Sequence, residues 1–358
     1  MIRFLTAGES HGPGLTCILD GCPAGVSIDF DLINFELKRR QKGYGRGARM
    51  KIESDQVEAM SGIRSGKTLG SPISFVIRNR DWENWTEIMD PRFPPSEELT
   101  GKKWKLAFDN RRPRPGHADL AGAIKFHEHD LRNVLERASA RETAARVACG
   151  AIAKQFLSNF EIEFASHVTR IGNVSLETPD LSLAKIRELS EESEVRCVDK
   201  NKEAEMVAAI KEAIVAKDSL GGVYEILVAG LPAGLGSFSQ WDTRLDSRLG
   251  AAMMSIQSVK GVEIGMGFRS AKMRGSEVHD RIYYEKGGDP RKGGFYRKTN
   301  NAGGLEGGIT NGEMLVVRAA NKPISTLYQP LDTVDIHTKE PAVAIVERTD
   351  NCVTPAHC

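Results

Sequence analysis

The sequence predicts an α+β protein of 358 residues folded as one large domain. Short apolar runs typical of strands and amphipathic segments typical of helices follow one another in irregular order, so a regular ladder of parallel βαβ units is not indicated. No linker rich in proline and serine divides the chain, and no repeat of fixed period is present. We therefore expect a single domain over residues 1–358.

In the first half of the chain, we expect strands at 2–7, 14–19 and 71–77, and helices at 31–42, 118–129 and 137–157. The strands are short apolar runs, and the first two flank a tight loop. The first helix places Ile33 and Leu37 on one face, carries cations near its C-terminal end and stops at Gly43. The third is rich in alanine, and Asn159 is its only plausible C-cap.

In the second half, we expect strands at 161–175, 222–229, 262–268, 313–320 and 342–348, and helices at 201–217 and 243–259. Residues 161–175 alternate in the manner of a strand, and the helix at 201–217 gathers Met206 and Ile210 on one side. Residues 270–300 are charged and contain several glycines, which predicts a long mobile loop.

Composition excludes several classes of protein. Lys and Arg number 49 against 48 Asp and Glu, so a net charge of +1 gives no general attraction to nucleic acid or an anionic membrane. Aromatic residues are 6% of the chain, too few to favour base-stacking surfaces. No apolar run has the length of a membrane helix, and the N-terminus is too soon polar for a signal peptide, which predicts a cytoplasmic protein without membrane partners. Six widely spaced cysteines without a C-x-x-C pair predict reduced thiols and no metal site.

Three apparent motifs fail on inspection. Residues 62–68 resemble a phosphate-binding loop but have three residues between the glycines, where the motif needs four, and a strand follows instead of a helix. Residues 12–17 lack the third glycine of a dinucleotide fingerprint. His127 and His129 are two positions apart, so they point to different sides of a helix and are better explained as a solvated helix end.

Two clusters of cations carry more weight. Residues 38–51 hold seven cations, three glycines and no acid. Such a run is often only a solvated face, but glycine lets backbone N–H groups approach a ligand, and the arginine fork fits phosphate or carboxylate. Residues 111–119, with sequence Arg-Arg-Pro-Arg-Pro-Gly-His-Ala-Asp, repeat this chemistry at a helix entry, where an anion is favoured. Together the clusters predict a small polyanionic substrate.

Two histidines lie beside glycines in turns, His11 in Gly-Glu-Ser-His-Gly and His117 in Pro-Gly-His-Ala-Asp. Histidine transfers protons near neutral pH, and loops commonly display reactive groups. A lone loop histidine is more often inert, but two of them accompanied by arginine clusters leave a catalytic role and an inert one equally open on the residues alone.

Eight short motifs follow one another along residues 1–356: Gly8-Glu9-Ser10-His11-Gly12, the segment from Arg40 to Arg46, Arg114-Pro-Gly-His-Ala-Asp119, Arg137-Ala-Ser-Ala-Arg-Glu-Thr143, Ser255-Ile-Gln-Ser-Val-Lys-Gly261, Asn300-Asn-Ala-Gly-Gly304, Lys322-Pro-Ile-Ser-Thr326 and Glu347-Arg-Thr-Asp350. In kind and order they resemble the motifs of the chorismate synthase family, and the resemblance covers nearly the whole chain. Each motif is weak alone, whereas eight in order are very specific.

The resemblance implies a lyase that forms chorismate by trans-1,4-elimination of phosphate from 5-enolpyruvylshikimate 3-phosphate, the last common step of the shikimate pathway to the aromatic amino acids. It implies reduced FMN as a cofactor with no net redox change, a β-α-β sandwich fold and a homotetramer. After residues 352–355 the family normally continues into an apolar C-terminal helix. From the resemblance, we expect this helix to be absent here.

By matching position, the resemblance also implies roles for single residues. His11 would protonate the departing phosphate, His117 would protonate or stabilise the reduced flavin, and Asp350 would help to remove the C6 proton. The expected substrate contacts are Ser10, Arg40, Arg46, Arg114, Arg141 and Arg348. The expected FMN contacts are Arg137, Ala138, Ser139, Gln257, Ser258, Gly307, Lys322, Pro323, Ile324, Ser325, Thr326 and Arg348.

Some alternatives stay open on the sequence alone. Arg40 and Arg46 could serve NADPH as a source of reducing equivalents, because they suit any polyanion. A flavin oxidoreductase would use similar residues but consume NAD(P)H in step with its substrate. A non-enzymatic phosphate- or RNA-binding protein is disfavoured by the neutral charge, the few aromatic residues and the two turn histidines.

Overall fold

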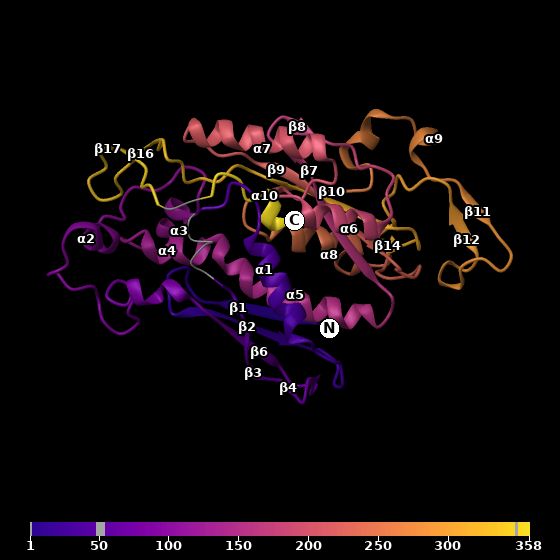
Figure 1. The fold of residues 1–358 in the computed structure, drawn as a ribbon, viewed down its shortest axis with the longest axis horizontal. Helices are drawn as coiled ribbons and strands as arrows, with labels where there is room; N and C mark the ends of the chain where they lie inside the picture. The colour runs from indigo at the N-terminus through magenta and orange to yellow at the C-terminus, as the bar shows by residue number, and fades with distance from the viewer. Residues whose placement is uncertain (1, 48–53, 348–349) are drawn as a thin grey trace. The chain divides into compact units, whose positions relative to one another are not determined.

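The computed structural model describes residues 2–47, 54–347 and 350–358 (Figure 1). It divides into two compact units, each assembled from separate segments. The first unit comprises Met1–Phe156, Ala213–Ser219 and Ile324–Asn351, and the second comprises Leu157–Glu212, Leu220–Pro323 and Cys352–Cys358. Neither unit is a continuous stretch of chain, and one domain over residues 1–358 stays a prediction.

The first unit contains an antiparallel sheet in the order β1-β2-β6-β3. Its strands are Arg3–Ala7, Gly14–Asp20, Ile73–Arg78 and Glu58–Ser61. In β2 and β6 every second side chain is buried, as the period of a half-buried strand requires. Helices α1 (Phe30–Gln41) and α5 (Thr143–Ser158) contribute Ile33, Leu37 and a row of alanines to the same core (Figure 1). The predicted strands at 2–7, 14–19 and 71–77 and the predicted helix at 31–42 are confirmed.

The loop resembling a phosphate-binding motif is a small hairpin of β4 (Ile63–Arg64) and β5 (Lys67–Thr68). Ser65 and Gly66 occupy its turn with φ values of 50° and 71°. Two successive positive φ angles are what a tight hairpin turn needs. The expectation that this loop opens no helix is therefore confirmed, and the absence of a phosphate site here stays a prediction.

The helical region that follows differs from its prediction. After η2 (Arg80–Asn84), α2 (Gly101–Phe108) and α3 (Asp119–Phe126), the expected helix at 137–157 is instead α4 (Arg132–Ala138), the short turn η3 (Ala140–Glu142) and α5. The break falls at Ser139, whose extended backbone and side chain cap η3 by accepting from the Arg141 amide. The prediction of one continuous helix from residue 137 is wrong, because the cap competes with helical hydrogen bonding. His127 is the C-cap of α3 and adopts the left-handed conformation, in agreement with its interpretation as part of a helix end.

The second unit contains a larger antiparallel sheet in the order β10-β15-β9-β7-β8. Its strands are Val259–Ile264, Leu315–Asn321, Gly222–Ala229, Glu163–Ile171 and Val174–Ser175. Helix α6 (Leu183–Glu192) packs on this sheet through Ile186, and α7 (Lys200–Val215) buries Met206 and Ile210 as predicted. The strand expected at 161–175 is interrupted by a turn at Gly172, and α8 (Leu245–Met254) ends before Val259 because that residue begins β10.

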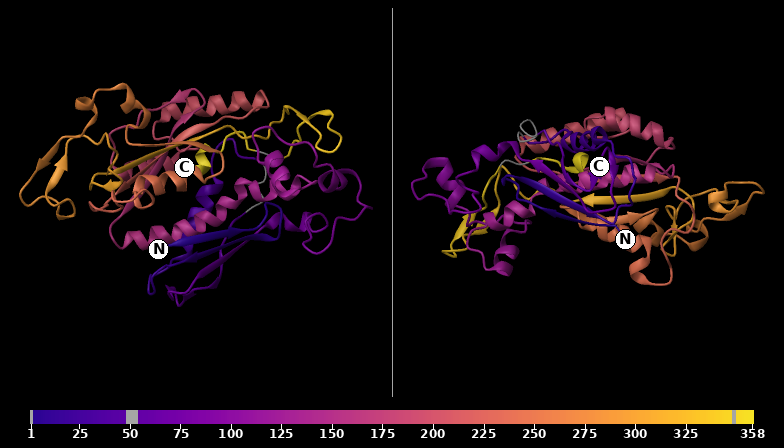
Figure 2. Two further views of the ribbon diagram at one scale, coloured as in Figure 1. Left: turned by 180° about the vertical axis from the view of Figure 1, so that it is seen from behind. Right: turned by 90° about the horizontal axis from the view of Figure 1, so that it is seen from below.

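Residues 270–300 are structured, so the expectation of a loop without secondary structure is wrong. Elements η5 (Gly267–Lys272) and α9 (Gly275–Val278) precede the hairpin of β11 (Ile282–Tyr284) and β12 (Phe295–Arg297), with η6 (Pro290–Lys292) in its connection. Tyr283 stacks on Tyr296 across the hairpin, with ring centroids 5.5 Å apart. Such aromatic pairs stabilise a hairpin but leave little trace in a charged sequence. The hairpin projects from the five-stranded sheet of its unit (Figure 2).

The remaining elements are short: β13 (Leu305–Glu306), β14 (Ile309–Thr310), β16 (Asp332–Val334), β17 (Pro341–Val343) and α10 (Thr354–His357). All six cysteines are free thiols, and five of them are buried. Within the described ranges, none of the helices combines the length and hydropathy that crossing a bilayer requires.

Candidate active site

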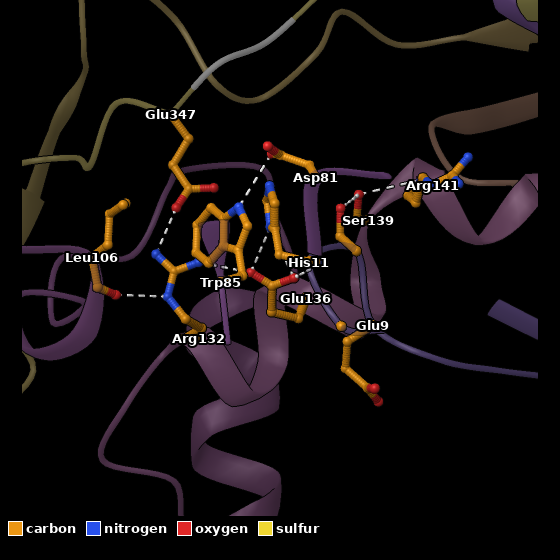
Figure 3. A network of polar contacts seen from close by, with 12 residues as sticks. Glu9, His11, Asp81, Trp85, Leu106, Arg132, Glu136, Ser139, Arg141 and Glu347 are labelled. Atoms are coloured by element: carbon orange, nitrogen blue, oxygen red, sulfur yellow. Dashed lines mark hydrogen bonds and ion pairs between the residues drawn. The ribbon is translucent and has the colours of Figure 1, made fainter. Parts of the chain in front are cut away.

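His11 lies in the loop between β1 and β2 and is held by a carboxylate from α4. Its backbone N–H donates to Glu136 Oε2 at 2.7 Å, and its ring Nδ1 lies 2.9 and 3.0 Å from the two carboxylate oxygens (Figure 3). The ring stacks on Trp85 with centroids 3.9 Å apart. Both the position of the His11 backbone and the orientation of its ring are therefore fixed.

Glu136 is itself buried and paired. Its Oε1 accepts from Arg132 Nη1 at 2.7 Å. Burial by itself would raise the pKa of this carboxyl, but the hydrogen bond from His11 and the charge of Arg132 outweigh burial and lower it. Arg132 also donates to the Leu106 carbonyl and to Glu347, each at 2.8 Å (Figure 3). A further bond from Arg132 to Asn110 is 3.0 Å long. Glu136 is thus ionised at neutral pH.

A second group, like that of His11, joins a histidine, a carboxylate and an arginine: His117, Asp119 and Arg114. The His117 Nδ1 lies 2.5 Å from Asp119 Oδ1 and 3.1 Å from Arg114 Nη2. A guanidinium only donates and a carboxylate only accepts, so the short contact to Asp119 assigns the Nδ1 proton to that hydrogen bond. The Arg114 backbone N–H, Nε and Nη2 all donate to Asp119, and Nη1 donates to Thr326 at 2.9 Å.

Asp119 is fully buried at the start of α3. Burial alone would raise its pKa, but hydrogen bonds from His117 and Arg114 hold the pKa well below the usual range. The Arg–x–x–His–x–Asp spacing of the sequence is therefore a local device, in which one carboxylate pins both a guanidinium and an imidazole.

A third group gathers arginines at the end of α1. Arg40 is buried, donates to Thr143 and to the Ala140 carbonyl at 2.8 and 2.9 Å, and lies 3.7 Å from Asp55. Among the described residues, its Nη1 has no hydrogen-bond partner. Burial and the charge of Arg141 lower the pKa of Arg40 to about 9.

Two further arginines surround Arg40. Arg141 forms a bidentate pair with Asp55, at 2.6 and 2.7 Å, and Arg46 donates to the Arg40 carbonyl at 3.0 Å. Arg46 also lies 3.0 Å from Asp350, which accepts from the Gly47 amide at 2.5 Å. Among these residues, three arginines are thus balanced by only two carboxylates, Asp55 and Asp350. A bound anion would offset the remaining positive charge.

Asn79 links the arginines to the His11 loop. Its side chain accepts from Arg141 Nε at 3.0 Å and donates to the Gly12 carbonyl at 2.7 Å. Ser139 donates to Ser10 at 3.2 Å, and Arg137 donates to the Thr6 carbonyl at 2.7 Å. A succession of hydrogen bonds and ion pairs therefore connects Ser10, His11, Arg40, Arg46, Arg137, Ser139, Arg141 and Asp350, and Ala138 lies between Arg137 and Ser139 in the chain.

The other predicted residues lie elsewhere. Arg114, His117 and Thr326 belong to the group around Asp119. In the first unit, the Ile324 carbonyl accepts from Ser219 at 2.7 Å, and Ser325 follows it in the chain. Arg348 lies outside the described residues. The remaining five belong to the second unit: Gln257, Ser258, Gly307, Lys322 and Pro323.

In the second unit, Ser258 and Lys322 are neighbours. The Ser258 carbonyl accepts from the Lys322 amide at 2.9 Å, and its hydroxyl donates to Asn321 at 3.2 Å. These contacts hold Ser258 at a φ of 70°, which is unusual for a residue with a side chain. Burial and then the charge of Lys260 lower the pKa of Lys322, so positive charge is concentrated at the end of β15.

Sequence reasoning gave no role to the residues that support these groups, namely Asp55, Asn79, Trp85, Asp119, Arg132 and Glu136. Asp119 could have been found, because it lies two residues from His117 in a motif rich in arginine. Glu136 is 125 residues from His11, and no local signal joins the two. Across the described residues, no three His, Cys, Asp or Glu side chains gather as a metal site would need.

Histidines that carboxylates hold in place, in a chain that also buries several arginines, are typical of an enzyme site for an anionic substrate. A family profile described as Chorismate synthase matches residues 2–358. Chorismate synthases of Alkaliphilus metalliredigens and Moorella thermoacetica are 54% and 56% identical to this chain over 99% of it and over 90% and 89% of their own lengths. The chain belongs to the chorismate synthase family.

A solved structure supports the same conclusion for the fold. The chain is similar to a structure titled "Crystal Structure of Chorismate Synthase", with a TM-score of 0.74 and 46% identity over 90% of this chain and 85% of the other. The family fold that the sequence resemblance implied is therefore confirmed.

Proposed function

We propose that this chain catalyses the reaction of its family, the trans-1,4-elimination of phosphate from 5-enolpyruvylshikimate 3-phosphate to give chorismate. The bond between C3 and the phosphate oxygen breaks, a proton leaves C6, and the electrons of the C6–H bond become part of the new diene. The observation that carries the proposal is that Asn79 bonds both the His11 loop, at the Gly12 carbonyl, and the buried Arg141, in a chain of this family.

The substrate carries a phosphate and two carboxylates, which matches the cations of the site. Arg40, Arg46 and Arg141 would bind these anions around the His11 loop, with Ser10 beside them. Arg114 and Arg348 complete the proposed set. Each charge-assisted hydrogen bond would contribute about 1.5–3 kcal/mol. The lowered pKa of Arg40 supports this role, because a guanidinium among other cations gains most from an anion.

The proposed catalytic residues act on protons. His11 donates a proton to the departing phosphate, which makes that group a better leaving group. Asp350 helps to remove the C6 proton, and its contact with Arg46, one of the proposed anion-binding residues, supports this role. His117 protonates or stabilises the reduced cofactor, and Asp119 holds its ring for this task.

The cofactor proposed from the family is FMN, which in its reduced form supplies electron density that returns to it in each turnover. The residues at the end of β15 fit a phosphate-bearing ligand, because Lys322 lies close enough to Lys260 for their charges to oppose one another. Gly307, with a φ of 59° and no atom within 4 Å of an added Cβ, would let a ring approach. The other proposed contacts in the second unit are Gln257, Ser258 and Pro323. Those in the first unit are Arg137, Ala138, Ser139, Ile324, Ser325 and Thr326. Arg348, outside the described residues, completes the proposed set.

The proposal is tested by measuring phosphate release from the substrate under anaerobic conditions, with FMN reduced by dithionite. We expect phosphate and chorismate in equal amounts and a flavin that stays reduced. Equal turnover with oxidised FMN would contradict the proposal. Consumption of NAD(P)H in step with the substrate would indicate a flavin oxidoreductase instead.

NADPH as a source of reducing equivalents is a finer proposal, with Arg40 and Arg46 as its binding residues. Turnover with NADPH and FMN in anaerobic buffer, without any other reductant, tests it. A homotetramer and a cytoplasmic location are further proposals that rest on the family resemblance. Sedimentation of the purified protein tests the first of these, and cell fractionation tests the second.

A further inference from the structure

We propose that Glu136 is the positioning residue of His11, holding the ring with Nδ1–H toward its carboxylate so that Nε2 delivers the proton to the leaving group. This inference rests on the proposed function for the identity of the proton acceptor. It does not depend on that function for the tautomer.

The hydrogen bonds assign the tautomer. Glu136 accepts from the His11 backbone N–H at 2.7 Å and faces Nδ1 at 2.9 and 3.0 Å. An ionised carboxylate has no proton to donate, so Nδ1 must carry one for these contacts to be hydrogen bonds. In the neutral ring the second nitrogen, Nε2, is then the basic one, and it gains and loses the transferable proton.

Arg132 keeps the carboxylate in the form that this role requires. Its Nη1 donates to Glu136 Oε1 at 2.7 Å, while its other nitrogens are fixed by Leu106 and Asn110. Glu347, at 2.8 Å, already supplies Arg132 with a counter-charge. Glu136 is therefore more than a counter-ion of Arg132, because Arg132 and Glu347 would form a complete ion pair without it.

Trp85 supplies the second constraint. Its indole stacks on the imidazole at 3.9 Å with an angle of 27° between the planes, and its Nε1 donates to Asp81 at 3.2 Å (Figure 3). Stacking fixes the plane of the His11 ring, and Glu136 fixes its rotation within that plane. A ring constrained in both respects presents Nε2 in one direction, which is what positioned proton transfer needs.

Glu136→Gln tests the role with little change of shape. All three groups that face this carboxylate are donors, so the new amide NH₂ must oppose one of them. We expect kcat to fall by about 10- to 100-fold, the range typical when a group that orients a catalytic ligand is replaced. The KM for the substrate should change by less than about threefold, because the arginines that bind the anion remain.

A double-mutant cycle separates positioning from general structural support. If Glu136 acts through His11, then Glu136→Gln should cost nothing further in a His11→Ala background. In a His117→Ala background, the matched control, the two losses should multiply. Equal losses in both backgrounds, or a folded Glu136→Gln variant with the kcat of the wild type, would overturn the proposal.

Nitrogen-15 NMR of the wild-type protein gives a readout that needs neither a variant nor turnover. At a pH where the ring is neutral, the His11 signals should show a protonated Nδ1 and a bare Nε2. In Glu136→Gln the two tautomers should mix. A wild-type ring protonated on Nε2 would overturn the proposal. Because this measurement uses no substrate, a failure of the elimination assay would leave it unaffected, and the two failures are distinguishable.

Discussion

His11 and His117 each direct Nδ1 at a buried carboxylate that an arginine also binds, yet the two groups are assembled differently. The carboxylate of His117 comes from Asp119, two residues away at the start of α3. The carboxylate of His11 comes from Glu136, 125 residues away on α4. The contacts among His117, Asp119 and Arg114 are made within six residues of chain, whereas the His11 contacts exist only when α4 packs against the loop between β1 and β2.

The arginines also differ in how they divide their hydrogen bonds. Arg114 donates to Asp119 from its backbone, Nε and Nη2, so this carboxylate is its main counter-charge. Arg132 gives Glu136 a single nitrogen and keeps Glu347 as a second carboxylate. Arg114 therefore depends on Asp119 for its counter-charge, whereas Arg132 depends less on Glu136 because it keeps Glu347.

The largest expected effects come from removing either ring. His11→Ala and His117→Ala should each lower kcat by about 10²–10⁴, the usual contribution of a positioned proton donor. Ligand binding should survive in both, because the arginines supply most of the attraction. Steady-state kinetics with reduced FMN and substrate, together with binding titrations, test this.

The two alanine variants should differ in the spectrum of bound reduced flavin. His117→Ala should alter it, since His117 is proposed to act on the cofactor, and His11→Ala should leave it nearly unchanged without substrate. If both variants turn over at the rate of the wild type, neither histidine is catalytic and both serve only in turns.

The next largest difference concerns stability. Asp119→Ala leaves Arg114 buried without its carboxylate, with Thr326 and the His117 ring as the side-chain partners that remain. Removing one member of a buried pair costs about 3–5 kcal/mol. Glu136→Ala should cost less, because Arg132 keeps Glu347. Urea unfolding followed by circular dichroism measures both free energies. A larger loss in Glu136→Ala would reverse our assignment of the two carboxylates.

The same contrast explains what the sequence could predict of the site. The cations of residues 38–51, the two histidines and the segment ending at Asp350 were identified from local composition and family motifs. Glu136 and Asn79 escaped, since their roles depend on contacts between α4, the loop after β1 and the end of β6. Residues close together in the sequence, such as His117 and Asp119, can be predicted to meet from their spacing. Distant residues such as His11 and Glu136 meet only through the packing of the fold.

The fold follows the same division. Strand β2 and helices α1 and α7 were predicted closely because their apolar periods are regular. The continuous helix from residue 137 failed at Ser139, where one side-chain cap outweighs a run of good helix formers. The sequence did not predict the hairpin of β11 and β12, because cross-strand aromatic pairs stabilise it and the sequence of a single strand does not reveal such pairs.

A smaller effect should appear in the dependence of stability on pH. The pKa values of Asp119 and Glu136 are lowered in the folded protein, so the unfolded state binds more protons as the pH falls below about 4, the ordinary carboxyl value. The stability that each carboxylate contributes is complete above that value and is lost as the pH drops toward its folded pKa.

Asp119→Asn and Glu136→Gln should therefore each flatten the acid side of the stability profile. The double variant should flatten it further, because the two groups share no hydrogen-bond partner among the residues described. Thermal unfolding between about pH 3 and 6 measures these slopes, with the values near neutral pH as the reference. A single variant with the slope of the wild type would mean that its carboxylate is not the one titrating.

The smallest expected effects separate anion binding from proton transfer. Arg46→Ala should raise the KM for the substrate about tenfold for each 1.4 kcal/mol of lost binding, because it removes a cation from a largely enclosed cluster. Its kcat should fall less than that of either histidine variant. Lys67→Ala is the matched control, since Lys67 is an exposed cation on the β5 hairpin that we exclude as a phosphate site. It should leave KM and kcat unchanged. If Lys67→Ala raised the KM more than Arg46→Ala, anion capture would lie outside the arginine cluster, and the two histidines would have to be reassigned with it.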